Sequence, residues 1–108
     1  MSYREKIKQH PLVRRMVEIV REASPGAQMI LFGSRARGDH RQDSDWDILV
    51  LLDSLSAGER DRIWNPINDL ELTADASINP VIRTKEYWRR STFTPFHHNV
   101  NHDGIVLL

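Results

Sequence analysis

The sequence predicts a small α/β (α+β) domain in which helices pack on a mixed β-sheet. Apolar residues near the N-terminus recur at three- and four-residue spacing, which is typical of an amphipathic helix, and short continuous apolar runs follow, which are typical of buried strands. The two patterns alternate, and helices that cover a sheet bury both kinds of apolar face. At 108 residues the chain is long enough for one such domain, 1–108, with a core at about 12–91 and a C-terminal extension at 92–108.

The first part of the chain predicts a helix, a strand and a turn. An amphipathic helix is expected over 12–23, because its apolar residues follow helical spacing and Pro11 suits a first helical turn. Ser24-Pro25-Gly26 ends this helix. The apolar run at 28–32 is expected to be a buried strand, and the glycine and serine after it turn into a short helix near 34–38.

The middle of the chain predicts two further strands around a helix. Residues 45–52 end in a continuous apolar run, so this strand is expected to be covered on both faces. The segment 56–72 carries an apolar helical stripe, and Pro66 inside it is expected to kink the helix or split it. A third strand is expected over 74–82, where Pro80 favours an edge position or a bulge.

The C-terminal part predicts two short helices and a final extended piece. Thr84 is suited to cap a helix over 85–91, and a short helix is expected after Pro95. Residues 104–108 are apolar and are expected to be extended. The predicted order is therefore α-β-α-β-α-β-α-α with a short terminal strand.

Composition narrows the class of protein. Lys+Arg and Asp+Glu are both 15, so the formal net charge is zero, which argues against a general nucleic-acid binder. The absence of cysteine excludes disulfides, zinc–thiolate sites and a cysteine nucleophile. The longest apolar run, 48–52, is too short to span a membrane, and the polar N-terminus lacks a signal-peptide core. A cytoplasmic protein without membrane association is expected.

Two acids at the start of the second predicted strand form a candidate metal site. Residues two apart in a strand point to the same side, about 6–7 Å apart, so Asp45 and Asp47 lie side by side with Trp46 turned away. Two aligned carboxylates repel each other unless a cation lies between them, and Mg²⁺ prefers oxygen ligands. Taken alone, such a pair is more often a solvated strand entrance.

A candidate phosphate site lies upstream of the acids. Gly33 stands where a strand meets a helix and lets the backbone approach a ligand closely, and Ser34 adds a hydroxyl beside free backbone N–H groups. Arg35 and Arg37 could add charge-assisted bonds to phosphate oxygens, or could form local salt bridges with acids of the following loop. The sequence leaves these two roles of the arginines open.

Together these residues resemble a known signature. Gly33-Ser34, ten intervening residues and Asp45-x-Asp47 before an apolar strand are similar to the motif of the DNA polymerase β-type nucleotidyltransferase superfamily. The string GSRARGDHRQDSDWDILV resembles its minimal nucleotidyltransferase branch, small domains often paired with a helical partner protein. The resemblance implies a polymerase β-like nucleotidyltransferase fold and an enzyme that transfers a nucleoside monophosphate from an NTP to an acceptor hydroxyl.

The resemblance also implies roles for individual residues. Gly33 and Ser34 would hold the terminal phosphates of an NTP, expected to be ATP, and Asp45 and Asp47 would bind Mg²⁺, up to two ions. The family uses a third acid on a neighbouring strand, for which Asp75 is the candidate catalytic and metal-binding residue and Glu71 is the fallback.

The expected partner is a protein. The minimal members suggest transfer of AMP to a side chain of a helical toxin in a toxin–antitoxin pair, and a homo-oligomer is the other expected way to complete the acceptor site. A non-catalytic antitoxin that binds a nucleotide or its partner is the alternative function. Three converging carboxylates favour the enzyme, and two favour the binding module.

Overall fold

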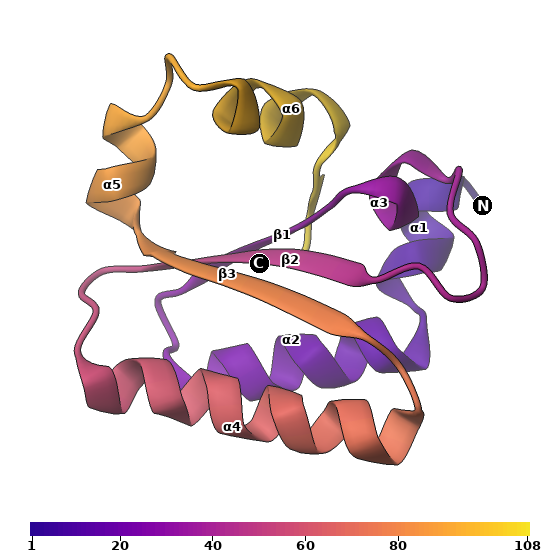
Figure 1. The fold of residues 1–108 in the computed structure, drawn as a ribbon, viewed down its shortest axis with the longest axis horizontal. Coiled ribbons are helices and arrows are strands. Elements are labelled where there is room, and N and C mark those ends of the chain that lie inside the picture. Colours follow the sequence, from indigo (N-terminus) through magenta and orange to yellow (C-terminus); the bar gives the residue numbers. More distant parts are fainter.

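The computed structural model describes residues 1–108 and contains four strands that form a single mixed sheet (Figure 1). The strands are β1 (Gln28–Phe32), β2 (Trp46–Leu52), β3 (Ile78–Thr84) and β4 (Ile105–Val106). Their order is β3-β2-β1-β4, in which β1 is antiparallel to both neighbours and β2 is parallel to β3. The mixed sheet is as predicted, and the strand that contains Pro80 lies at an edge, as expected.

Six helices surround the sheet. They are α1 (Tyr3–Lys8), α2 (Pro11–Ala23), α3 (Ser34–Arg37), α4 (Ala57–Ala74), α5 (Lys85–Arg90) and α6 (Pro95–Asp103). Helices α2 and α4 cover one face, and α5 and α6 lie over the other (Figure 1). Helix α1 is not among the elements that the sequence predicts, and its Ile7 is buried in the main core. None of the six helices combines the length and the apolar composition that a membrane crossing requires.

Strand β2 is buried on both faces. Ile48, Val50 and Leu52 belong to the main core with α2 and α4, whereas Leu49 and Leu51 belong to a second cluster that includes Val100 of α6. The side chains alternate between the two clusters because successive residues of a strand point to opposite faces. The continuous apolar run thus has cover on both sides, as predicted, and it fixes the register of the acids at its start.

Helix α4 continues through Pro66, so of the two expected outcomes, a kink or a split, the split is wrong. Ile63 and Ile67, on either side of the proline, are buried to 1% and 0% exposure. Packing of these residues on the sheet holds both halves in one helix, although Pro66 has no N–H to donate to the Arg62 carbonyl.

The third strand begins later than predicted. Residues up to Ala74 belong to α4, and Asp75 ends that helix in the left-handed conformation, with φ 49°. The segment predicted as the start of a strand is therefore a helix end and a connection, and β3 occupies Ile78–Thr84. The C-terminal residues are part of the fold, because β4 pairs with β1.

Candidate active site

Asp45 and Asp47 flank the first residue of β2. Trp46 points into the core between the sheet and α2 and is 3% exposed. Asp47 is half-buried, Asp45 is exposed, and the alternation of side chains directs both acids to the side opposite Trp46. The backbone is fixed at this point because Trp46 N donates to the Ser77 carbonyl at 2.8 Å. The two predicted metal ligands thus lie at one end of β2, with Asp45 exposed and Asp47 half-buried.

The turn after β1 packs directly against this acid pair. Phe32 is the register partner of Asp47 on β2, so the next residue, Gly33, lies beside the Asp47 side chain. Gly33 has φ 74°, and a Cβ at this position would overlap the Asp47 carboxylate oxygen Oδ2. Only glycine allows the backbone and the carboxylate to approach this closely. The two halves of the sequence motif therefore form one site.

The turn also presents unused donors. The carbonyl of Gly33 accepts from the N–H groups of Ala36 and Arg37 in α3. The N–H groups of Ser34 and Arg35, and the Ser34 hydroxyl, make no hydrogen bond within the chain. Since unpaired donors beside a close backbone approach suit an anion, the turn can receive phosphate oxygens.

Arg35 and Arg37 have different surroundings. The Arg35 guanidinium donates to the carbonyls of Ser44 and Gln42 at 3.0–3.2 Å and lies 4.3 Å from the centre of the Trp46 ring. It therefore holds the loop that leads into Asp45. Arg37 forms an ion pair with Asp39 at 3.2 Å, and its side chain is 44% exposed. Local contacts thus use Nε and Nη2 of Arg35, whereas Arg37 pairs with Asp39 and, at 4.0 Å, with Asp103.

The structure does not bring Asp75 to the acid pair, which corrects its expected place. Asp75 is the C-cap of α4, before β3 begins, and no three acidic or histidine side chains of the chain come together as a metal site. Glu71, the fallback, accepts a hydrogen bond from Ile78 N at 3.0 Å and so holds the start of β3. The reason is the later start of β3. Asp75 and Glu71 therefore belong to the end of α4 and not to the strand beside Asp47.

Asn79 occupies the position opposite Asp47 instead. The two residues are register partners on the parallel strands β3 and β2, and Asn79 Nδ2 donates to Asp47 Oδ1 at 3.0 Å. Sequence reasoning missed Asn79 because the predicted third strand started too early. The signal that could have found it is the pattern of β3 itself, in which Ile78 and Ile82 face the core and Asn79 therefore faces the acids.

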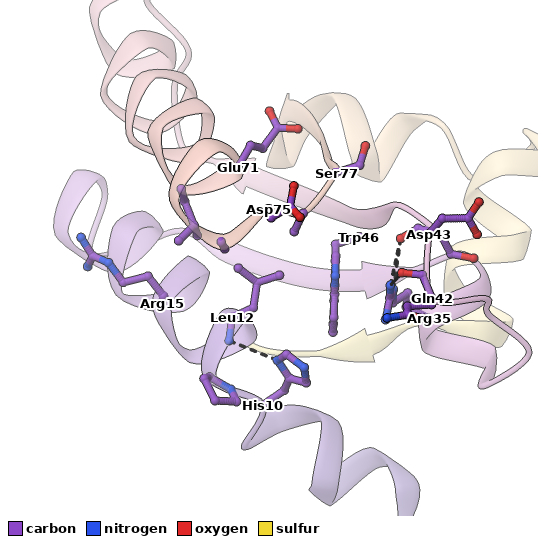
Figure 2. Close-up of a pocket in the computed structure, with 15 residues that line it drawn as sticks. His10, Leu12, Arg15, Arg35, Gln42, Asp43, Trp46, Glu71, Asp75 and Ser77 are labelled. Atoms are coloured by element: carbon purple, nitrogen blue, oxygen red, sulfur yellow. Dashed lines mark hydrogen bonds between the residues drawn. The ribbon is translucent and has the colours of Figure 1, made fainter.

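A cavity lies on the other side of β2. It measures about 820 Å³, and Trp46 stands between Glu71, Asp75 and Ser77 on one side and Arg35, Gln42 and Asp43 on the other (Figure 2). Neither Asp45 nor Asp47 lines it. His10 lines the cavity beside Trp46, with ring centres 4.8 Å apart. Burial, and then the positive charge of Arg35, lower the pKa of His10 below its ordinary value.

The sequence of the chain matches a known protein family. The model of the nucleotidyltransferase domain matches residues 13–99, which include the turn at Gly33 and both acids. The chain belongs to the nucleotidyltransferase domain family. It is therefore a nucleotidyltransferase, an enzyme that transfers a nucleoside monophosphate, and the polymerase β-like fold expected from the motif is confirmed.

Relatives and solved structures agree with this assignment. Two proteins of Methanocaldococcus jannaschii, provisionally named protein adenylyltransferases, are 35% identical over 80 residues and 32% identical over 79 residues. The matches cover 74% and 72% of this chain, and 76% and 75% of the relatives. A toxin–antitoxin crystal structure with AMP-PNP matches with a TM-score of 0.63 and 26% identity, over 88% of this chain and 71% of that one. A mutant of the toxin–antitoxin MntA-HpeT matches with the same TM-score and coverage and 25% identity.

Proposed function

We propose that this nucleotidyltransferase transfers AMP from ATP to a hydroxyl group on a helical, toxin-type partner protein. The observation that carries the proposal is the direct packing of Gly33 against Asp47, which joins the proposed phosphate-binding turn to the pair of acids at the start of β2. Two relatives bear the name protein adenylyltransferase, and a similar toxin–antitoxin structure contains AMP-PNP. Both findings favour an adenine nucleotide and a protein acceptor.

The Gly33–Ser34 turn is the proposed binding site for the terminal phosphates. Its free N–H groups and the Ser34 hydroxyl can donate to phosphate oxygens. Arg37 is the arginine that we assign to phosphate binding, because its exposed side chain can leave Asp39 and the more distant Asp103 for a stronger anion. Arg35 serves the same site indirectly by holding the loop before Asp45.

Asp45 and Asp47 are the proposed ligands of Mg²⁺. The donor set fits this ion, because both side chains are oxygen donors on one side of a strand and the Gly33 turn would place phosphate oxygens beside Asp47. Mg²⁺ supplies charge neutralisation of the triphosphate during transfer. The fit extends to two protein carboxylates, because the position opposite Asp47 carries the neutral Asn79.

The reaction follows from this placement. The acceptor oxygen forms a bond to the α-phosphorus, the bond from that phosphorus to the bridging oxygen breaks, and pyrophosphate leaves with the electron pair. The acceptor hydroxyl releases its proton to solvent water in this exchange. Asp45, Asp47 and the turn contribute by holding the triphosphate in line with the acceptor and by presenting preorganised charges and donors to it.

A second candidate function is nucleotide-dependent binding of the partner without transfer. It is favoured by the acid count, since only two carboxylates gather at the site. Under this alternative the chain would neutralise a toxin by contact. Both candidates use the same turn and the same acids, so they differ only in whether AMP reaches the partner.

The test is incubation with ATP labelled at the α-phosphate, Mg²⁺ and the protein encoded by the neighbouring gene. The label should reach the partner, and an Asp45→Asn, Asp47→Asn double variant should lose the transfer. A matched control is Asp61→Asn, Asp69→Asn, which removes two exposed carboxylates from α4. Transfer that persists in the first variant would exclude the proposed site. A stable complex without label would favour the binding function.

A further inference from the structure

The side chain opposite Asp47 sets the charge of the metal site. We propose that Asn79 is a positioning residue that fixes the Asp47 carboxylate and limits the site to one divalent cation per chain. The inference rests on the proposed function, because it concerns the ion that Asp45 and Asp47 would bind. It departs from the expectation of a third acid and up to two ions.

The geometry fixes Asp47 from both sides. Asn79 Nδ2 donates to Asp47 Oδ1 at 3.0 Å, and Oδ2 of the same carboxylate lies against Gly33, where a Cβ would overlap it. No other side chain of the chain donates a hydrogen bond to Asp45 or Asp47. Because the amide donor stands in register on the neighbouring strand, its hydrogen bond favours one orientation of the carboxylate.

The contact between Asn79 and Asp47 also determines the negative charge of the proposed metal site. The amide of Asn79 contributes no negative charge, so the site holds the two charges of Asp45 and Asp47, which match one divalent cation. A second cation would have to rely mainly on phosphate oxygens and water. The number of charged ligands tunes the affinity of an oxygen site for such ions, so two carboxylates favour single occupancy.

The Asn79→Asp substitution should therefore add a negative charge to the site and favour a second cation. The new carboxylate would replace a donor with an acceptor 3.0 Å from Asp47 Oδ1, and the two negative charges would repel each other. A cation between them would relieve the repulsion. The Asn79→Asp variant should lose stability without metal, recover it with metal, and bind one more ion.

The experiment counts Mn²⁺ on the full-length chain without nucleotide, because a triphosphate binds Mn²⁺ itself, by titration followed with electron paramagnetic resonance. The wild type should bind one Mn²⁺ and Asn79→Asp two. Asn79→Ala should keep one ion with an affinity about tenfold lower, because the support of Asp47 is lost. Asn68→Asp, the same change at an exposed position of α4, is the matched control and should resemble the wild type.

Thermal unfolding gives a second readout. The unfolding midpoint of Asn79→Asp should fall below that of the wild type without Mn²⁺ and should rise more steeply when Mn²⁺ is added. Two ions on the wild type, or an unchanged count in Asn79→Asp, would overturn the inference. Failure of the proposed function would give a different result. Mn²⁺ binding would then survive in the Asp45→Asn, Asp47→Asn double variant. Absence of Mn²⁺ from the wild type would overturn both.

Discussion

At the scale of single residues, the position of Gly33 requires glycine. Its φ of 74° and its contact with the Asp47 carboxylate both exclude a side chain. Gly33→Ala should lower the free energy of unfolding by about 1–3 kcal/mol, because alanine is strained at this φ and its Cβ displaces Asp47. Displacement of the acid should also slow the proposed AMP transfer by about 100-fold. Urea denaturation and the labelled-ATP assay measure the two effects.

Gly58 provides the control for this substitution. It lies in the first turn of α4, and a Cβ there would meet no atom within 4 Å. Gly58→Ala should therefore raise the free energy of unfolding by about 0.4–1 kcal/mol and leave transfer unchanged. Equal effects of the two substitutions would show that the position of Gly33 beside Asp47 is of no consequence.

His10 predicts a dependence of stability on pH. Its Nδ1 accepts the N–H of Leu12 at the start of α2, which requires the unprotonated form, and burial followed by the charge of Arg35 lowers its pKa. The unfolded chain therefore binds the proton more readily than the folded chain. Stability contributed by neutral His10 is present above the unfolded pKa of 6.5 and is lost as the pH falls from there toward the lower folded pKa.

The His10→Asn variant separates this contribution from those of the other histidines. Asparagine caps a helix but does not titrate in this range. Between about pH 7 and pH 5 the free energy of unfolding should fall more steeply for the wild type than for the variant. Urea denaturation across this range makes the comparison, and parallel curves would contradict the assignment to His10.

At the scale of elements, α4 contains a proline that lowers the stability of the helix. The helix continues through Pro66 because Ile63 and Ile67 anchor it on both sides, while the hydrogen bond to the Arg62 carbonyl is missing. Pro66→Ala should raise the free energy of unfolding by about 1–3 kcal/mol, since the bond is restored and the ring no longer crowds the preceding turn. Urea denaturation of the two proteins measures the difference.

The matched control is the proline at the first position of α6. Pro95 needs no N–H partner there and its fixed φ suits a helix start. Pro95→Ala should lower the free energy of unfolding by about 0.4–1 kcal/mol, because only the unfolded chain gains freedom. A loss of stability in Pro66→Ala would instead mean that packing of the Pro66 ring outweighs the missing hydrogen bond.

Elements with a strong local pattern were predictable from the sequence. The runs at 28–32 and 45–52 give β1 and β2 within one residue, because their apolar side chains are continuous and are bounded by turn residues. The start of β3 was not predictable in this way. Residues 74–77 alternate in polarity and also fit a helix end, and the left-handed Asp75 that decides between them depends on how α4 packs.

The placement of the candidate site residues was predictable to the same extent. Gly33, Ser34, Asp45 and Asp47 follow from local spacing, and the structure brings the turn and Asp47 into contact. Asn79 could not be assigned because its place depends on the register of a parallel pair formed across α4. Because β3 was expected to start too early, the third acid was expected at Asp75. That residue is the C-cap of α4 and precedes the connection to β3.

At the scale of the whole molecule, the order β3-β2-β1-β4 places the site at the centre of the sheet and the weak pairings at its edges. Asp47 on β2 is held by Gly33 after β1 and by Asn79 on β3, so three segments far apart in sequence fix one carboxylate. Strand β1, in turn, is closed on its outer side only by the C-terminal residues. The position of the turn therefore depends on the last residues of the chain.

Removal of residues 105–108 tests this dependence. Ile105 is 1% exposed, and Met29 of β1 exchanges backbone hydrogen bonds of 2.8–3.2 Å with Leu107 and Leu108. The truncated chain should lose about 3–5 kcal/mol of unfolding free energy through the lost burial, and the bare edge of β1 should promote self-association. Urea denaturation and light scattering follow the two effects. Val106→Ser, at a position that is 59% exposed, should change neither. A truncated chain that stays monomeric and as stable as the wild type would mean that β1 holds the Gly33 turn without β4.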